Sequence, residues 1–275
     1  MSILMSMSPW PYPFWIAHRG AGKLAPENTL AAFRVGAAHG WRAFECDVKL
    51  SRDGVPFLLH DDSLDRTTPR TGLAADFDWA ELSRLDAGGW HSGAFAGEPP
   101  PSLEAIARFV LRNGHLLNIE LKPSPGQEWQ TGHAVGLACL DLWRDRDAPV
   151  PPVPPVPPLF SSFKPEALRG ARDSAPALPR ALLLDTQWPG WCATAQDLGC
   201  VAVVTHHLLM DAPLVAQLHG AGMRALCYTV NEPADARRLM ALGVDGLISD
   251  AVDVFAPGPL SGQPQNVPSE QDKSP

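Results

Sequence analysis

Short apolar runs alternate with amphipathic, helix-like segments along most of the chain. In the second half the runs are, in order, LLNIELK, PLFSSF, RALLLD, VAVVTHH, RALCYTV and GLISD. Glycines stand just before several of these runs, as expected at the ends of helices in a repeated strand–helix unit. With about 30 residues per unit, the pattern predicts an α/β fold, a (β/α)8 TIM barrel rather than an open doubly wound sheet. Nine strand-like runs occur in all, so one is expected to lie outside the barrel.

The first part of the chain holds three of these runs. Residues 14–17 are expected to form the first strand, followed by a helix that Asn28 caps and Gly40 ends. The next runs, RAFECDVKL and VPFLLH, are separated only by a turn at SRDG. That spacer is too short for a crossover helix, so it predicts either a hairpin or a unit that has lost its helix. In a hairpin, Glu45 and His60 would lie roughly opposite each other.

Three segments depart from the repeat. Periodicity weakens over residues 62–114, which we interpret as a small insertion after the third strand; it closes with a helix that Ser102 caps. Residues 148–158 are rich in proline and predict an extended spacer. Residues 257–275 have the composition of a disordered tail. The expected organisation is thus a single catalytic TIM-barrel domain over residues 1–256.

Composition narrows the function. Apolar residues make up 45% of the chain and the net charge is −8, so a sizeable core is available and a nucleic-acid partner is not expected. Five cysteines without a CxxC pair suit reduced thiols, and no run approaches the ~18 apolar residues of a membrane span. These features predict a soluble, cytoplasmic protein without stable membrane insertion. They leave its oligomeric state open.

Polar side chains gather where the predicted strands end, which is where βα barrels carry their active sites. They are His18, Arg19, Glu45, Asp47, His60, Asp61, Glu120, Lys122, Ser161, Ser162, His206, His207, Tyr228, Asn231, Ser249 and Asp250. Residues two apart on a strand share a face, so both members of each pair Glu45/Asp47 and Glu120/Lys122 point the same way.

Three converging carboxylates, Glu45, Asp47 and Glu120, would repel one another unless a cation lay among them. Oxygen ligands favour Mg²⁺ or Ca²⁺, with Mn²⁺ as a further candidate. The competing interpretation is a buried ion network in which these acids pair with nearby Arg and Lys side chains. Two histidines beside such a cation suit attack on a phosphodiester, one taking a proton and the other giving one.

The same residues fall into motifs that resemble the glycerophosphodiester phosphodiesterase family, and they run in order from about Ile16 to Asp253. The motifs are HRG at 18–20, PENT at 26–29, ExD at 45–47, a turn of the form SxDG, HD at 60–61 followed by LDRTT, ELK at 120–122, SSF at 161–163, YTVN and DGLISD. The segment GGWHSGAFAGEPPPSL is similar to the insertion that this family carries. Tyr228 and Ser249 depart from it, because the family often has Trp and Thr there.

The resemblance implies a TIM barrel that hydrolyses glycerophosphodiesters, such as glycerophosphocholine and glycerophosphoethanolamine, to sn-glycerol 3-phosphate and an alcohol. It implies a divalent cation and a small-molecule substrate, and the chain is most similar to the cytoplasmic bacterial branch. The roles it implies are acid/base catalysis by His18 and His60, metal binding by Glu45, Asp47 and Glu120, phosphate binding by Arg19 and Lys122, and a glycerol-side wall of Phe163 and Tyr228. Two alternatives stay open: lysophospholipase D-like cleavage, and a barrel that binds glycerophosphate ligands without turnover.

Overall fold

Eight parallel strands close into a barrel in the computed structural model, which describes residues 10–144, 155–255 and 257. Closure comes from β1, which pairs with β9 on one side and with β2 on the other. The fold predicted from the repeat, a TIM barrel, is confirmed. The barrel strands are β1 (Trp15–Ala17), β2 (Ala43–Leu50), β4 (Leu116–Leu121), β5 (Leu159–Ser162), β6 (Arg180–Leu184), β7 (Ala202–His206), β8 (Arg224–Tyr228) and β9 (Gly246–Ser249).

The ninth described strand, β3 (Pro56–Leu58), lies outside the barrel and pairs antiparallel with the end of β2. Lys49 stands opposite Phe57, and the turn between the strands contains Gly54 at a φ of 82°. Glycine adopts such a φ at no steric cost, which helps the chain to reverse in so few residues. Of the two alternatives for this spacer, the hairpin is confirmed.

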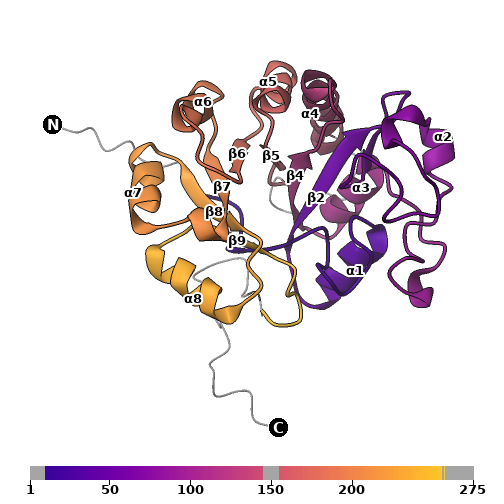
Figure 1. Cartoon of the computed structure of the whole chain (residues 1–275), viewed down its shortest axis with the longest axis horizontal. Helices are drawn as coiled ribbons and strands as arrows, with labels where there is room; N and C mark the ends of the chain where they lie inside the picture. Colours follow the sequence, from indigo (N-terminus) through magenta and orange to yellow (C-terminus); the bar gives the residue numbers. More distant parts are fainter. Residues whose placement is uncertain (1–9, 145–154, 256, 258–275) are drawn as a thin grey trace, which may run out of the picture.

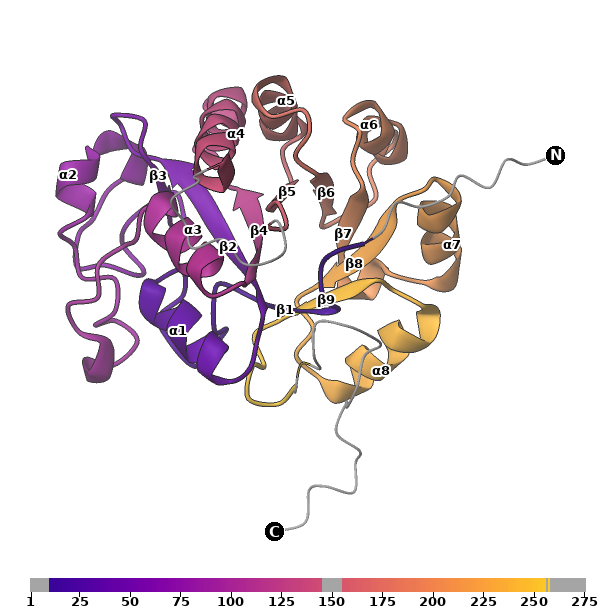
Figure 2. The ribbon, with the colours of Figure 1, turned by 180° about the vertical axis from the view of Figure 1, so that it is seen from behind.

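Helices cover the outside of the barrel as a ring, and the segment around α2 projects at one side (Figure 1, Figure 2). In the described residues they are α1 (Leu30–Ala38), α2 (Trp79–Leu82), α3 (Leu103–Arg112), α4 (Glu128–Arg144), α5 (Pro165–Ser174), α6 (Trp191–Asp197), α7 (Ala212–Gly220) and α8 (Pro233–Leu242), with 3-10 turns η1 (Ala74–Asp76), η2 (Gly93–Phe95) and η3 (His207–Leu209). None of these helices is long and apolar enough to cross a membrane.

Two helix caps had been predicted, and one of them is wrong. Ser102 caps α3 as expected, because its hydroxyl accepts from the main-chain N–H of Ala105. The cap of α1 is Thr29, whose side chain accepts from Ala32, and not Asn28. Asn28 has a φ of 59°. That left-handed conformation takes its side chain away from the helix and toward the barrel mouth.

The core has two layers. Strand side chains that point outward pack under the helices, as Phe44 does against Phe33 of α1 with ring centroids 5.1 Å apart. Side chains that point inward fill the barrel, and Tyr12 joins them at the amino end of the strands. The Tyr12 hydroxyl donates to the carbonyl of Pro157 at 2.8 Å, so the described end of the proline-rich spacer helps to close this end. Residues 148–154 of that spacer and 258–275 of the predicted tail lie outside the described residues.

Helices α4 and α5 approach each other more closely than ordinary side chains permit. A Cβ added at Gly132 would clash with the carbonyl oxygen of Ala167, and one at Gly170 would clash with that of Trp129. The two helices therefore pack backbone to backbone through glycine. This contact anchors the segments on either side of β5, which carries part of the barrel mouth.

Candidate active site

Three carboxylates meet inside the carboxyl end of the barrel. Glu45 and Asp47 come from β2, and Glu120 comes from β4, where it stands in register with Asp47. One oxygen of each lies within 4.8 Å of one oxygen of the other two. Their side chains are almost completely buried, since alternation along each strand turns them into the barrel.

Two of these acids, Glu45 and Glu120, are disfavoured in their charged forms, whereas Asp47 is favoured in its charged form. Burial and the charge of Asp47 raise the pKa of Glu45, and the same two causes raise that of Glu120. Burial acts on Asp47 in the same direction, but Arg19 and Lys122 outweigh it and hold its pKa at about 2. Glu45 Oε1 is buried and has no hydrogen-bond partner among the described residues. An oxygen-only cluster with an uncommitted buried oxygen fits a hard divalent cation.

Two cationic side chains contact the carboxylates of this cluster. Arg19 Nε lies 3.3 Å from Asp47 Oδ2, and the Arg19 main-chain N–H donates to Glu45 Oε2 at 3.0 Å. Lys122 Nζ lies 2.8 Å from Glu120 Oε1 and 3.7 Å from Asp47 Oδ1. Both cations are partly exposed at the mouth, so they can bind an anion that enters there.

His18, at the end of β1, faces an acid on each side. Its Nδ1 lies 2.6 Å from Asp250 Oδ1, and its Nε2 lies 3.8 Å from Glu45 Oε2. Asn231 donates to the other oxygen of Asp250 at 3.1 Å and fixes that carboxylate. Burial would lower the pKa of His18, but Asp250 and Glu45 together outweigh it and raise the pKa.

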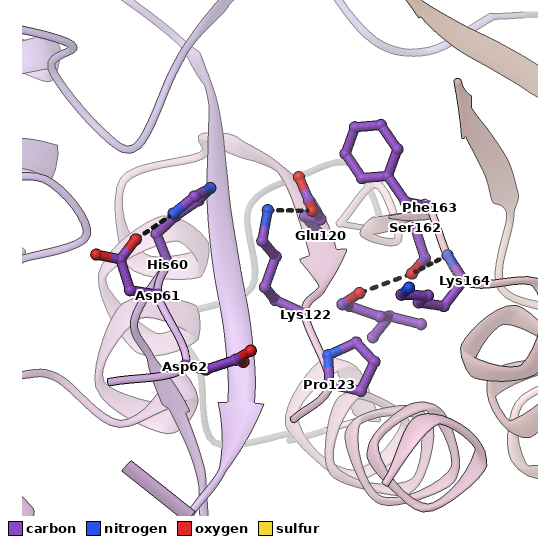
Figure 3. A pocket seen from close by; sticks show the side chains of 10 residues that line it. His60, Asp61, Asp62, Glu120, Lys122, Pro123, Ser162, Phe163 and Lys164 are labelled. Atoms are coloured by element: carbon purple, nitrogen blue, oxygen red, sulfur yellow. Dashed lines mark hydrogen bonds and ion pairs between the residues drawn. The ribbon is translucent and has the colours of Figure 1, made fainter. Parts of the chain in front are cut away.

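His60 follows β3 and has a carboxylate partner of its own. Its Nδ1 lies 2.7 Å from Asp61 Oδ1, and Asp61 accepts from Arg66 Nε at 2.6 Å. Burial lowers the pKa of His60. Figure 3 shows the second ring nitrogen of His60 pointing away from Asp61, on the side of Lys122. Each histidine thus has its Nδ1 paired with a carboxylate, an arrangement that suits proton transfer at Nε2.

Two pockets open at these side chains. The deep pocket, of ≈ 240 Å³, enters the barrel and is lined by His18, Arg19, Glu45, His60, Asn118, Glu120, Lys122, Ser161, Phe163, Leu183, Tyr228, Thr229 and Ile248. The outer pocket, of ≈ 280 Å³, is lined by His60, Asp61, Asp62, Glu120, Leu121, Lys122, Pro123, Ser162, Phe163 and Lys164 (Figure 3). They share His60, Glu120, Lys122 and Phe163, so a molecule bound at these four can extend into both.

Aromatic side chains form one wall of the deep pocket. The rings of Phe163 and Tyr228 meet edge to face with centroids 5.6 Å apart. Lys122 Nζ lies 5.6 Å from the centroid of the Phe163 ring. His206 packs edge-on against Tyr228 at 5.9 Å, but neither it nor His207 lines either pocket.

Several site residues were missed by the sequence interpretation. Asn28 donates to Asp47 Oδ2 at 2.8 Å and accepts from the Asp47 main-chain N–H at 3.0 Å. Asn118, two residues before Glu120, is 3% exposed, and both atoms of its amide lack a hydrogen-bond partner in the described residues. Strand alternation gave the signal for Asn118, because it shares the inward face with Glu120. Ser161, which the strand-end pattern did include, has an equally unpartnered hydroxyl.

A closed βα barrel with an acidic cluster, two acid-paired histidines and two cations at its mouth has the groups that hydrolysis of a phosphodiester requires. The model of the glycerophosphoryl diester phosphodiesterase family matches residues 18–254. A glycerophosphodiester phosphodiesterase from Caldanaerobacter subterraneus is 31% identical over 86% of this chain and 93% of the relative. The chain belongs to the glycerophosphoryl diester phosphodiesterase family.

Solved structures agree. An Oleispira antarctica phosphodiesterase in complex with the product sn-glycerol-3-phosphate superposes with a TM-score of 0.78 and is 34% identical, covering 87% of this chain and 94% of that one. A glycerophosphodiester phosphodiesterase from Agrobacterium tumefaciens has a TM-score of 0.70 and is 27% identical, covering 89% of this chain and 99% of that one.

Proposed function

We propose that the enzyme hydrolyses glycerophosphodiesters such as glycerophosphocholine and glycerophosphoethanolamine to sn-glycerol 3-phosphate and an alcohol, with a divalent cation held by Glu45, Asp47 and Glu120. The observation that carries this proposal is the approach of the three carboxylates to within 4.8 Å around an uncommitted Glu45 oxygen. Mg²⁺ or Ca²⁺ fits the oxygen ligands, and Mn²⁺ is also compatible. When bound, such an ion would neutralise the phosphoryl oxygens as a Lewis acid.

Arg19 and Lys122 are proposed to bind the phosphate. Both already face Asp47, and their donors are in fixed positions at the pocket mouth. A phosphoryl oxygen that enters between them would receive hydrogen bonds as negative charge builds up on the attacked phosphorus group. Stabilisation of that charge by groups already in place is usually the largest contribution to such catalysis.

His18 and His60 are proposed to move the protons. Asp250 and Asp61 hold the two rings by Nδ1, so each Nε2 has a defined position at the mouth. One imidazole takes a proton from the nucleophile, and the other gives one to the leaving alkoxide. A substrate with an activated leaving group separates these roles, because a p-nitrophenolate leaves without help from an acid.

The glycerol part is proposed to occupy the deep pocket. Asn118 and Ser161 offer a buried polar edge there, while Leu183 and Ile248 offer an apolar one. Glycerol presents hydroxyls on one edge and carbon on the other, so the two edges match. Phe163 and Tyr228 are assigned to the wall beside it.

The test is release of glycerol 3-phosphate from glycerophosphocholine by the purified protein. We expect release with Mg²⁺, Mn²⁺ or Ca²⁺, loss after chelation, and recovery when the ion is restored. Glu45→Gln should abolish activity at ordinary ion concentrations, whereas Glu104→Gln, on the exposed face of α3, serves as the matched control. No release from any glycerophosphodiester with any of these ions would reject the proposal.

Two further comparisons address the alternatives. Faster cleavage of lysophosphatidylcholine than of glycerophosphocholine would favour the lysophospholipase D-like reaction. A double variant, His18→Ala with His60→Ala, that matched the wild-type rate would favour a barrel that only binds. In the single variants, the one rescued by a p-nitrophenyl ester of glycerol 3-phosphate is the one that lacks the acid.

Location and organisation are proposals as well. All five cysteines are unpaired, which supports a reducing compartment such as the cytoplasm. One catalytic domain over residues 1–256, with an insertion over residues 62–114, is the organisation we propose. Within that span, α3 occupies the place of the barrel helix between the β2–β3 hairpin and β4.

A further inference from the structure

The outer pocket lies beyond the proposed phosphate position. One side of it is the loop after β3, which carries Asp62, and the other side is the segment between β5 and α5, which carries Lys164 (Figure 3). Its inner wall is the set of residues that it shares with the deep pocket, including His60 and Lys122. A diester whose glycerol fills the deep pocket therefore places its other alcohol in the outer pocket.

Asp62 is held so that its carboxylate faces the outer pocket. The Lys49 ammonium donates to Asp62 Oδ1 at 3.2 Å and also to the main-chain carbonyl of Asp61. Lys49 is 0% exposed whereas the Asp62 side chain is 50% exposed. The buried lysine thus fixes the loop, and in the described residues Asp62 Oδ2 makes no hydrogen bond. That oxygen remains available to a ligand.

Lys164, on the opposite side, has an anchored backbone and an uncommitted side chain. Its main-chain N–H donates to Ser162 Oγ at 3.1 Å, and Ser162 in turn donates to the carbonyl of Leu121 at 2.7 Å. Lys164 is exposed, and no acid within the described ranges pairs with its ammonium. The pocket therefore has an uncommitted oxygen of the Lys49-paired Asp62 carboxylate on one side and an ammonium without a paired acid in the described residues on the other.

Resting on the proposed function, we propose that the outer pocket selects a leaving alcohol that carries both an ammonium and a carboxylate, as serine does. The ammonium would face Asp62 and the carboxylate would face Lys164. Choline and ethanolamine satisfy only Asp62 and bring a second cation toward Lys164, while an uncharged alcohol satisfies neither. In the reaction, water supplies the oxygen that bonds to phosphorus, the phosphorus–oxygen bond to serine breaks, and the serine oxygen gains a proton.

Glycerophosphoserine and glycerophosphoethanolamine form the decisive pair of substrates, because they differ by one carboxylate. We expect the wild-type kcat/KM to be higher for glycerophosphoserine. Lys164→Met should lower the ratio of the two values about threefold to fivefold, the effect of one partly exposed ion pair, and Lys164→Glu should lower it further. Arg112→Met, which removes an exposed cation at the opposite end of the barrel beside the start of β4, is the matched control and should leave the ratio unchanged.

Asp62 is tested by a second ratio, glycerophosphoethanolamine against glycerophosphoglycerol, since only the former carries an ammonium. Asp62→Asn should lower this ratio, and the use of a ratio cancels any general loss caused by a weaker hold of Lys49 on the loop. A folded Lys164→Met enzyme with the wild-type preference between the first two substrates would overturn the inference. An enzyme inactive on these three substrates but active on glycerophosphocholine would also overturn the inference, whereas one inactive on all four would instead reject the proposed function on which the inference rests.

Discussion

Ionisation of Glu45 is unfavourable in the metal-free protein, because burial and the charge of Asp47 both raise its pKa. We expect Glu45→Gln to raise the melting temperature of the metal-free protein. Wild type should gain roughly 5–10 °C from a cation at about 100 times its dissociation constant, which corresponds to ~2.7 kcal/mol. The variant should gain almost nothing. Thermal unfolding with and without Mg²⁺ or Mn²⁺ measures both changes in melting temperature, with Glu104→Gln as control. An equal rise with the ion in wild type and in Glu45→Gln would show that the ion does not bind at Glu45.

Asn118 shows how a residue can be costly to the fold and useful to the site. Its amide is buried and has no hydrogen-bond partner among the described residues, and leaving such groups unpaired costs about 1–3 kcal/mol. Asn118→Leu, similar in volume, should therefore unfold at the same or a higher temperature, while KM for glycerophosphodiesters rises about tenfold through lost hydrogen bonds. Calorimetry and steady-state kinetics give the two readings. A less stable variant with an unchanged KM would contradict this role.

At the scale of residues, the alternation of side chains along strands allowed site residues to be predicted from the sequence. Glu45, Asp47 and Glu120 followed from their positions on strand ends, and they do converge. Asn28 was misinterpreted because its left-handed φ depends on contact with Asp47 across the barrel mouth, which no local propensity encodes. The pairing of His18 with Asp250 spans 232 residues and required closure of the barrel.

At the scale of elements, four residues cannot hold a crossover helix, so spacing left two alternatives, a hairpin or a unit without its helix, and the structure has the hairpin. Spacing did not predict the contact between α4 and α5. Within those helices glycine is an unfavourable residue for helix formation, so Gly132 and Gly170 make sense only through the backbone contact that they permit. Helix propensity describes an isolated helix, whereas this backbone contact exists only between two helices.

Gly170→Ala should destabilise the protein by about 1–3 kcal/mol, since the added Cβ would clash with the carbonyl of Trp129 in α4. Gly220→Ala, at the end of α7, is the matched control. No atom lies within 4 Å of a Cβ added there, so we expect that variant to be about 0.5–1 kcal/mol more stable. Urea unfolding measures both. Equal effects of the two substitutions would show that the helices can separate without cost.

At the scale of the whole molecule, Arg66 joins two segments of the chain. It donates to both oxygens of Glu27 at 2.7 Å and to Asp61 at 2.6 Å, and Glu27 also pairs with Arg19 at 2.9 Å. Arg66 thereby links the segment after β3 to the loop before α1 and to the partner of His60. The hydrogen bond from Arg66 is the main reason that the pKa of Asp61 is lowered. Burial would raise the pKa of Glu27, but Arg66 and Arg19 outweigh it and lower that pKa.

Acid stability should depend on this connection. Groups with a lowered folded-state pKa stabilise the protein above their unfolded pKa of about 4, and that stabilisation is lost as pH falls. Arg66→Gln should cost about 1 kcal/mol at pH 7, and the difference from wild type should shrink below about pH 4. Chemical unfolding over this range tests it, with Arg112→Gln as control. A difference that grew toward acid pH would reverse the sign and reject the argument.

The closed amino end of the barrel has a kinetic consequence. Tyr12 fills that end, and in the described part of the chain both pockets open only among the carboxyl ends of the strands. Both products are then expected to leave at the carboxyl end of the barrel, and glycerol 3-phosphate lies deeper than the alcohol. Release is expected to be ordered, the alcohol first, so that added glycerol 3-phosphate inhibits competitively with substrate and the alcohol does not. Initial-rate product-inhibition patterns test this order of release.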